Sequence, residues 1–186
     1  GPIGVTGPTG PSRGRNSIFV WKETIQALGT NIWERIIFTN GPIGPNPTSW
    51  NFGSPSNDTV VNNTPGTNWF LISYKIDVDA GNDTSYNPIK CAASLVLNAQ
   101  AILGSGTLVQ APERDHIYTI ANTVLVSSTL NDIVELQIIC NNANTSIGRV
   151  SATPDTLFTS FELFPIGAPA YYAIQATASL VITRID

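Results

Sequence analysis

Apolar and polar side chains alternate with a period of two in the strongest segments that follow residue 16. In residues 72–79 the apolar side chains take the even positions and the polar ones take the odd positions. Because successive side chains of a strand point to opposite faces of a sheet, this alternation predicts one buried and one solvent-facing side. No stretch keeps a helical period over three turns. The sequence therefore predicts an all-β domain.

Further strands are predicted where short apolar runs lie between clusters of Gly, Pro, Asn and Ser. Residues 93–104 are expected to form a hairpin in which Asn98 opens the turn. Residues 40–57 hold four prolines and are expected to form a long loop. About eight to ten strands at this spacing indicate a two-sheet antiparallel β-sandwich, for which a jelly roll is a common topology. The other predicted strands are residues 17–21, 32–38, 119–126, 133–140 and 174–183.

Glycine stands at every third position of residues 1–12, and proline follows it in three of these four triplets. This is the period of the collagen triple helix, whose shared axis has room only for glycine. The period ends where Gly14 falls one position late. We therefore expect residues 1–15 to be the end of a collagen-like stalk and residues 16–186 to be a β-sandwich head. A triple helix needs three chains, so a homotrimer is expected, and four triplets are too few to hold it together.

Composition excludes two classes of partner. The formal net charge is -4, and the nine Lys and Arg residues are scattered along the chain. They form no basic stripe that would bind nucleic acid or anionic lipid. No apolar run approaches the roughly 18 residues of a membrane-spanning helix. We expect neither a nucleic-acid partner nor membrane insertion.

Cys91 and Cys140 are the only cysteines of the chain. Two cysteines permit one bridge within the chain, two free thiols, or links between chains. Both lie in apolar segments that we predict to be strands, and cysteine is among the residue types most often buried. Of the three states we favour two buried free thiols.

The chain shows no constellation typical of an enzyme. A hydrolase needs a nucleophile and a base of matched pKa, and His116 is the sole histidine, in a charged stretch. We interpret His116 as a solvent-exposed loop residue and predict no catalytic residue and no cofactor. Asp77, Asp79 and Asp83 offer the oxygen ligands that calcium prefers, but they lack the flanking helices and terminal Glu of an EF-hand loop. We assign no metal site and keep calcium as an alternative.

The four tryptophans could stack on sugar rings, but large aromatic side chains more often fill cores and oligomer interfaces. We favour core and interface positions. Trp50, which lies in the proline-rich loop, is the one that we predict to be exposed.

Five segments stand in an order that resembles known families, and they are residues 34–40, 74–76, 93–98, 130–136 and 178–185. A collagen-like stretch that leads into a β-rich domain looks like the complement globular-head and tumour necrosis factor-like jelly rolls. The closer resemblance, carried by the five segments, is to the collagen-like exosporium glycoproteins of bacterial endospores. The resemblance implies a tight trimer formed through apolar inner sheets, and glycosylated threonines in the stalk, here Thr6 and Thr9.

The leading interpretation is an extracellular structural protein, displayed on a spore or similar particle surface. The head would form the trimer and set the register of the stalk, with Tyr171 and Tyr172 as candidates for the trimer axis. The alternative is a receptor-binding adhesin or a phage or virus fibre tip that binds a receptor or glycan through residues 40–57 and 113–117. The side chains predicted to fill the core are Tyr74, Ile76, Leu95, Leu97, Leu136, Ile138, Leu180 and Ile182.

Overall fold

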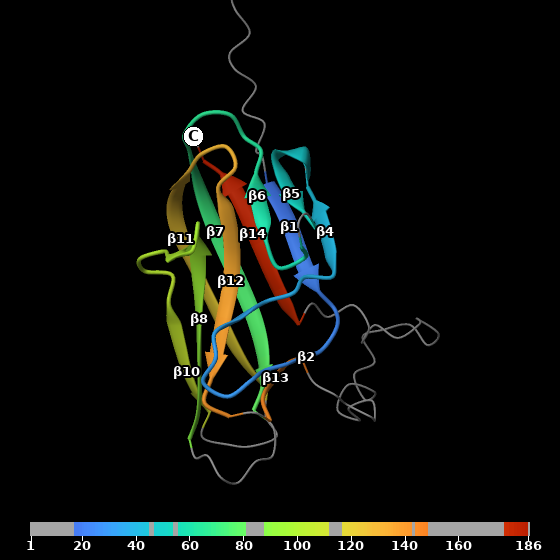
Figure 1. The fold of residues 1–186 in the computed structure, drawn as a ribbon, viewed down its shortest axis with the longest axis vertical. Coiled ribbons are helices and arrows are strands. Elements are labelled where there is room, and N and C mark those ends of the chain that lie inside the picture. The colour runs from blue at the N-terminus through green and yellow to red at the C-terminus, as the bar shows by residue number, and fades with distance from the viewer. Residues whose placement is uncertain are drawn as a thin grey trace, which may run out of the picture.

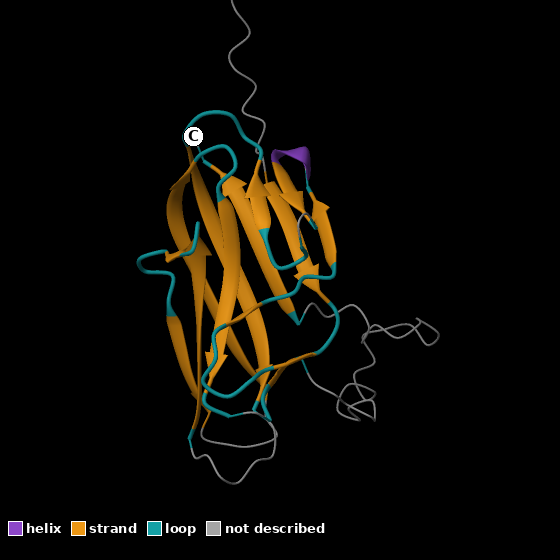
Figure 2. Ribbon diagram, viewed as in Figure 1, coloured by secondary structure: helices purple, strands orange, loops and turns teal. Residues whose placement is uncertain are grey.

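The computed structural model describes residues 17–44, 47–53, 56–80, 88–111, 117–142, 144–148 and 177–185. Two antiparallel sheets pack face to face in the described residues (Figure 1). One short 3-10 helix, Pro47–Ser49, accompanies the strands in the same residues (Figure 2). The prediction of an all-β sandwich is therefore confirmed.

Sheet A is centred on β7, the strand Asn68–Asp79. β11 pairs with β7 along its whole length on one side. On the other side β14 pairs with residues 70–76 of β7, and β13 pairs with its last two residues. The sheet then continues from β14 to β1 and β4, and from β13 to β2. The remaining bounds are Ser17–Lys22 for β1, Gln26–Ala27 for β2, Asn40–Ile43 for β4, Ile117–Ser128 for β11, Ser146–Ile147 for β13 and Ala178–Arg184 for β14.

Sheet B has the strand order β10-β8-β12-β6-β5, with β3 paired to β12 and β9 paired to β8. Its strands are Glu34–Arg35 for β3, Trp50–Phe52 for β5, Val60–Asn62 for β6, Ile89–Leu97 for β8, Gln100–Ala101 for β9, Thr107–Ala111 for β10 and Ile133–Cys140 for β12. The first strand, β1, lies beside the last, β14, and the chain crosses repeatedly between the sheets. This is jelly-roll topology.

The core lies between the two sheets and follows the predicted alternation. The even-numbered side chains of β7 are all buried, and the odd-numbered ones face out. Seven of the eight side chains that we predicted to fill the core are buried, and Leu97 is partly buried against it. Tyr74 donates its hydroxyl hydrogen bond to the carbonyl of Ser105 at 2.7 Å, and burial raises the pKa of the Tyr74 phenol.

The segment that we predicted as a strand over residues 32–38 forms only the two-residue strand β3. On one edge this segment bonds to β12, where Ile36 also donates its N–H to the carbonyl of Leu136. On the other edge the Gln26 side chain stands in for a strand, because its amide donates to the carbonyl of Arg35 and accepts from the backbone N–H of Ile37. Nearby, Lys22 donates to the carbonyl of Ile37 at 2.9 Å, and burial lowers the pKa of the Lys22 ammonium.

The predicted long loop at residues 40–57 was also wrong, because it contains β4, the 3-10 helix and β5. Pro42 lies in β4, which is an edge strand because among the described strands it pairs with β1 alone. An edge strand tolerates a proline, which has no N–H to donate. Trp50, which we predicted to be exposed, is only 1% exposed. Its ring meets that of Phe70 edge to face, with the ring centroids 5.1 Å apart. Prolines at an edge and at a helix start therefore do not prevent the residues between them from entering the core.

The predicted hairpin turn after β8 is confirmed. Asn98 and Ala99 both have positive φ, at 50° and 66°, as a two-residue primed turn requires. The Asn98 side chain accepts from the N–H of Ile133 and donates to the carboxylate of Asp132. The short side chain of Asn98 thus ties this turn to the start of β12.

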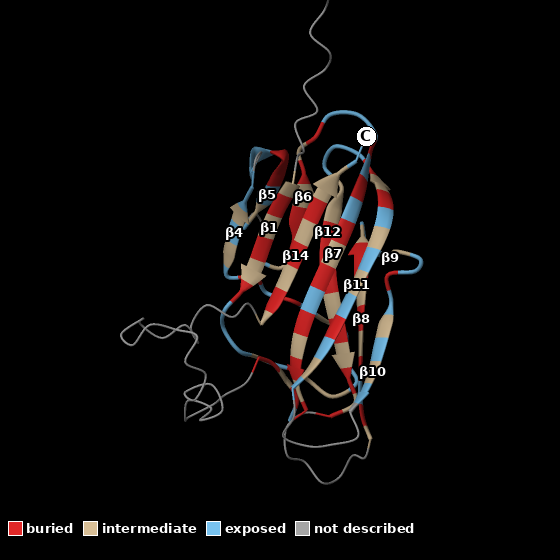
Figure 3. Ribbon diagram, turned by 180° about the vertical axis from the view of Figure 1, so that it is seen from behind, coloured by how far each residue is buried: buried red, intermediate tan, exposed pale blue. Residues whose placement is uncertain are grey.

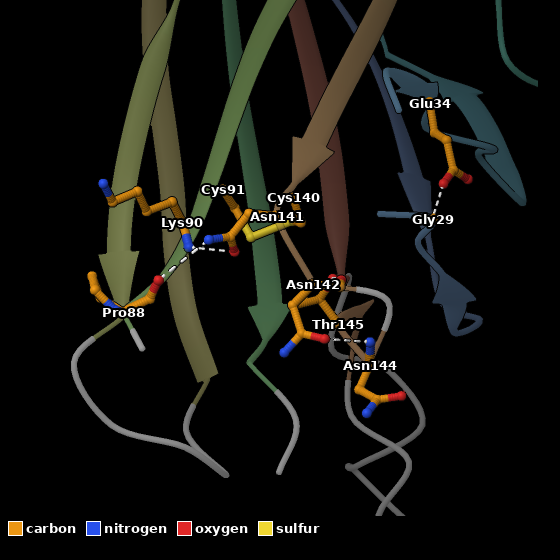
Figure 4. Close-up of a disulfide and its surroundings, with 10 residues drawn as sticks. All are labelled: Gly29, Glu34, Pro88, Lys90, Cys91, Cys140, Asn141, Asn142, Asn144 and Thr145. Carbon is orange, nitrogen blue, oxygen red and sulfur yellow. Dashed lines mark hydrogen bonds between the residues drawn. A yellow bond between two sulfur atoms is a disulfide. The ribbon is translucent and has the colours of Figure 1, made fainter. Parts of the chain in front are cut away.

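Cys91 and Cys140 form a disulfide, so the free thiols that we favoured were wrong. Both side chains are buried, as expected. The two residues lie directly opposite each other on the neighbouring strands β8 and β12, with their Cα atoms 4.2 Å apart (Figure 4). Strand pairing decides this contact, and pairing cannot be seen in the periodicity of either strand.

Two ion pairs of Arg35 support the pairing of β3 with β12 in sheet B. Arg35 contacts the carboxylates of Asp58 at 3.3 Å and of Glu135 at 3.0 Å, and the Glu135 side chain is only 8% exposed. Arg35→Met is expected to lower the free energy of unfolding by about 2 kcal/mol, because it leaves a buried carboxylate without its cation. Thermal unfolding measures this effect.

Adding Glu135→Gln to Arg35→Met is the matched control. The double variant should recover part of the loss, since the buried group is then neutral. Unchanged unfolding of Arg35→Met would show that the ion pair contributes nothing to stability.

Candidate assembly surface

The outward face of sheet A is the surface that departs most from a solvated sheet. Figure 3 looks onto this face, where buried and exposed residues alternate along β7. Strand register sets its side chains in rows. Leu125, Leu71 and Thr183 stand side by side in one row, and Thr123, Ser73 and Val181 form the next. Phe19 extends the second row.

Large apolar side chains occupy many of these outward positions. Trp69 is 48% exposed and Leu71 is 39% exposed, although both stand at positions where alternation predicts polar residues. The rings of Phe19 and Trp21 stack with centroids 5.1 Å apart. We call the whole group the sheet A patch. It consists of Phe19, Trp21, Ile43, Trp69, Leu71, Leu125 and Val181.

The charged residues that face out from β7 all lie beyond Ser73, away from the strand's beginning. Lys75 contacts Asp77 at 2.8 Å, and Thr119 donates to the same carboxylate at 2.7 Å. Asp79 follows at the end of the strand. The outward face of β7 is thus apolar in its first part and charged in its second. An apolar surface without charge is typical of the centre of a protein interface.

The apolar part lies at the end of the sandwich where β1 begins. Ser17, the first described residue, pairs with Thr183, which stands next to Leu71. Figure 1 shows that β1 starts at the same end of the molecule at which β14 finishes. The expected stalk precedes Ser17 in the chain, so the Leu71 and Leu125 side of the sheet A patch adjoins the point from which that stalk would depart.

Several residues singled out in the sequence cannot be compared with the structure. The described residues leave out His116, Asp83, Tyr171, Tyr172, Thr6 and Thr9, together with all of residues 1–16. Asp77, a candidate calcium ligand, already accepts hydrogen bonds on both carboxylate oxygens. Among the described residues no three His, Cys, Asp or Glu side chains gather as a metal site would require. Calcium binding therefore stays an alternative to the prediction of no metal site.

The tryptophans fall in three different environments. Trp50 fills the core, whereas Trp21 and Trp69 belong to the sheet A patch. Trp33 is half exposed between β2 and β3. Core and surface-patch positions thus account for three of the four. Alternation could have indicated Trp69 and Leu71, because each is an apolar residue in the polar phase of β7.

No helix among the described residues is long and apolar enough to cross a membrane. No protein-family model and no curated protein sequence matches the chain. Solved structures do match it. Two of them are crystal structures of murine APRIL, one at pH 8.5 with a TM-score of 0.50 and one at pH 5.0 with a TM-score of 0.52. Each is 10% identical to this chain, and each alignment covers 92% of this chain and 99% of the other. At this identity the likeness shows the fold alone, and that fold is a tumour necrosis factor-like jelly roll.

Proposed function

We propose that this protein is a non-catalytic, homotrimeric head that assembles a collagen-like stalk and is displayed on a spore or similar particle surface. One observation carries the proposal. Most of the apolar sheet A patch lies at the end of the sandwich where β1 begins and where the stalk would depart. Three copies that bury this patch against one another would bring their three stalks together.

The mechanism is thermodynamic. Three stalks tethered to one trimeric head have a high effective concentration, so formation of their triple helix becomes nearly intramolecular. The expected stalk in this chain has only four Gly-x-y triplets, which supports a head that supplies the association energy. The resemblance to exosporium glycoproteins also implies a trimer formed through apolar sheets, and the sheet A patch fits that expectation.

Three finer parts of the proposal rest on the sequence. Residues 1–15 would be the end of the stalk and residues 16–186 the head, and Thr6 and Thr9 would carry glycans. The buried disulfide favours an oxidising environment, as found outside cells. An extracellular location agrees with that chemistry.

Light scattering of the whole chain tests the proposal. We expect three times the 19.9 kDa of one chain at low micromolar concentration. A variant with Gly4, Gly7 and Gly10 changed to Ala, which removes the collagen period, should keep this mass, because the head holds the trimer. A monomeric wild type would refute a trimeric head. A trimer that the glycine changes abolish would place assembly in the stalk.

One feature favours a receptor-binding adhesin or fibre tip as the second candidate. Ile32 and Trp33 are both exposed between β2 and β3, on a segment outside the sheet A patch. Exposed aromatic residues are enriched among binding hot spots. A glycan and protein array would give saturable binding that Trp33→Ala abolishes. Inert display predicts no such binding.

A further inference from the structure

The outward face of sheet B carries an apolar row of side chains beside a polar one. β3 pairs with β12 so that Arg35 stands opposite Gln137. Continuing this register by two residues places Trp33 opposite Ile139, in the same outward phase as Arg35. On the other side of β12, Ala92 of β8 stands opposite Ile139. The apolar row is therefore Trp33, Ile139 and Ala92, and Arg35 and Gln137 belong to the polar row next to it.

The segment that carries Trp33 is held firmly on both sides. Asn31 donates its N–H to the carbonyl of Cys140 at 2.7 Å, and Ile36 donates to the carbonyl of Leu136 at 2.8 Å. Trp33 lies between these two bonds and is nevertheless 49% exposed. Its exposure thus belongs to the folded backbone. An exposed aromatic ring on a rigid support loses little conformational entropy when a ligand packs on it.

The polar row has hydrogen-bonding capacity that the fold leaves unused. Arg35 contacts Asp58 and Glu135, but its side chain is still 49% exposed, and a guanidinium has five N–H donors. The Gln137 amide donates to Glu135 at 2.7 Å, whereas its carbonyl oxygen has no partner among the described residues. The contacts with the two carboxylates fix the direction of both side chains. A donor and an acceptor are therefore presented beside the Trp33 indole.

A flat aromatic ring beside planar hydrogen-bonding groups matches the two-sided chemistry of a pyranose sugar. The C–H groups on one face of the sugar pack on an indole, and its hydroxyls bond with guanidinium and amide groups. Charge favours a neutral sugar. Two cations, Arg35 and Lys90, stand with two carboxylates, Asp58 and Glu135, so an acidic sugar would lose hydration without a net attraction. A purely apolar ligand would leave the covered Gln137 carbonyl without a partner.

We propose that Trp33, Arg35 and Gln137 bind a neutral hexose of a glycan, which stacks on the indole and bonds to the other two side chains. This inference rests on the receptor-binding role given above as the second candidate function, and it names the ligand. The outward face of sheet B is opposite to the sheet A patch, and Figure 1 shows this side with β8 and β12 in front. A trimer that buries the sheet A patch would therefore present three such sites, whose avidity strengthens weak single contacts.

Saturation-transfer difference NMR of the whole chain tests the site. The probes are the methyl glycosides of glucose, galactose and mannose, with N-acetylneuraminic acid as the acidic comparison. At least one neutral glycoside should receive saturation, most strongly at the C–H protons of one ring face, and the acidic sugar should receive none. Trp33→Ala and Gln137→Ala should each weaken binding of that glycoside about tenfold. Trp33→Phe should retain part of the affinity, because an aromatic ring remains.

Leu130→Ala is the matched control. Leu130 is 48% exposed, much like Trp33, and precedes β12 at the end of that strand opposite to Ile139. This variant should bind the glycoside as the wild type does, and all variants should keep the wild-type circular dichroism. A protein that transfers saturation to no neutral glycoside, or equally with and without Trp33, refutes the sugar site. In that case a protein target that loses binding with Trp33→Ala would identify the receptor as a protein.

Light scattering separates this site from the trimeric head. The site belongs to a single chain, so a monomeric wild type with Trp33-dependent sugar binding would refute the trimeric head and support the site. A trimer without such binding would refute the site and leave the head as proposed.

Discussion

Leu71→Glu is expected to convert the proposed trimer into a monomer. Leu71 stands in the apolar part of β7 between Leu125 and Thr183, and its side chain points away from the core. A carboxylate there would be removed from water on assembly without a cation to pair with, at a cost of several kcal/mol per interface. Three such interfaces in a ring multiply the effect. Sedimentation should show one chain mass at concentrations where the wild type is a trimer.

The matched control is Ala121→Glu. Ala121 is exposed on β11 and lies directly opposite Lys75, so a carboxylate at this position gains a cationic neighbour. It lies in the row that holds Lys75, three strands away from Trp21, which is the residue of the sheet A patch in that row. This variant should stay trimeric, and both variants should fold with the circular dichroism of the wild type. A trimeric Leu71→Glu protein would show that the sheet A patch is not the interface.

The alternation along β7 predicted its inward side chains correctly, since Ile72, Tyr74, Ile76 and Val78 are all buried. Period two is a local property of a strand, so it can be recognised in the sequence. The same rule, extended back to residues 69 and 71, would have marked Trp69 and Leu71 as outward-facing. Their apolar character in the polar phase was the available signal of an interface, and it was visible without the structure.

Residues 32–38 and 40–57 show where local pattern fails. The first segment is apolar enough to suggest a strand, but only its residues 34 and 35 pair with β12, the Gln26 amide bonds its other edge, and Trp33 is exposed. In the second segment the prolines indicated a loop, yet Trp50 enters the core against Phe70. Both outcomes depend on contacts with residues that are distant in the sequence. Propensity and spacing do not contain that information.

The sheet A patch and the expected stalk favour a particular function only when they are taken together. Neither an apolar sheet face nor a short glycine period specifies a function alone, because many proteins bury such a face in a dimer. The expected collagen-like stalk would require three chains, and most of the patch lies where those chains would enter the head. A three-fold assembly satisfies both features at once. It also leaves the β2–β3 segment with Trp33 outside the sheet A patch, where the alternative binding role can be tested separately.

Loss of the disulfide is expected to destabilise the head strongly. Cys91 and Cys140 are 49 residues apart in sequence, and closing a loop of that length stabilises a fold by about 4 kcal/mol in the chain-entropy model. The bridge joins β8 to the last residue of β12, its neighbour in sheet B. It therefore constrains strands that contribute Leu95 and Leu136 to the core. Cys91→Ala/Cys140→Ala should therefore unfold at a temperature roughly 10 °C lower.

The measurement is best made in the Leu71→Glu background, because assembly would otherwise add a concentration-dependent stabilisation that hides the effect. Reductant should lower the unfolding temperature of the protein with wild-type cysteines toward that of the double alanine variant, and it should not change that variant. The reductant thus separates the bridge from any packing lost with the two sulfur atoms. If reductant leaves the unfolding temperature of the cysteine-containing protein unchanged and unreduced denatured protein titrates two thiols, the bridge is absent in solution. In that case the two cysteines are buried thiols and sheet B is stabilised by its packing alone.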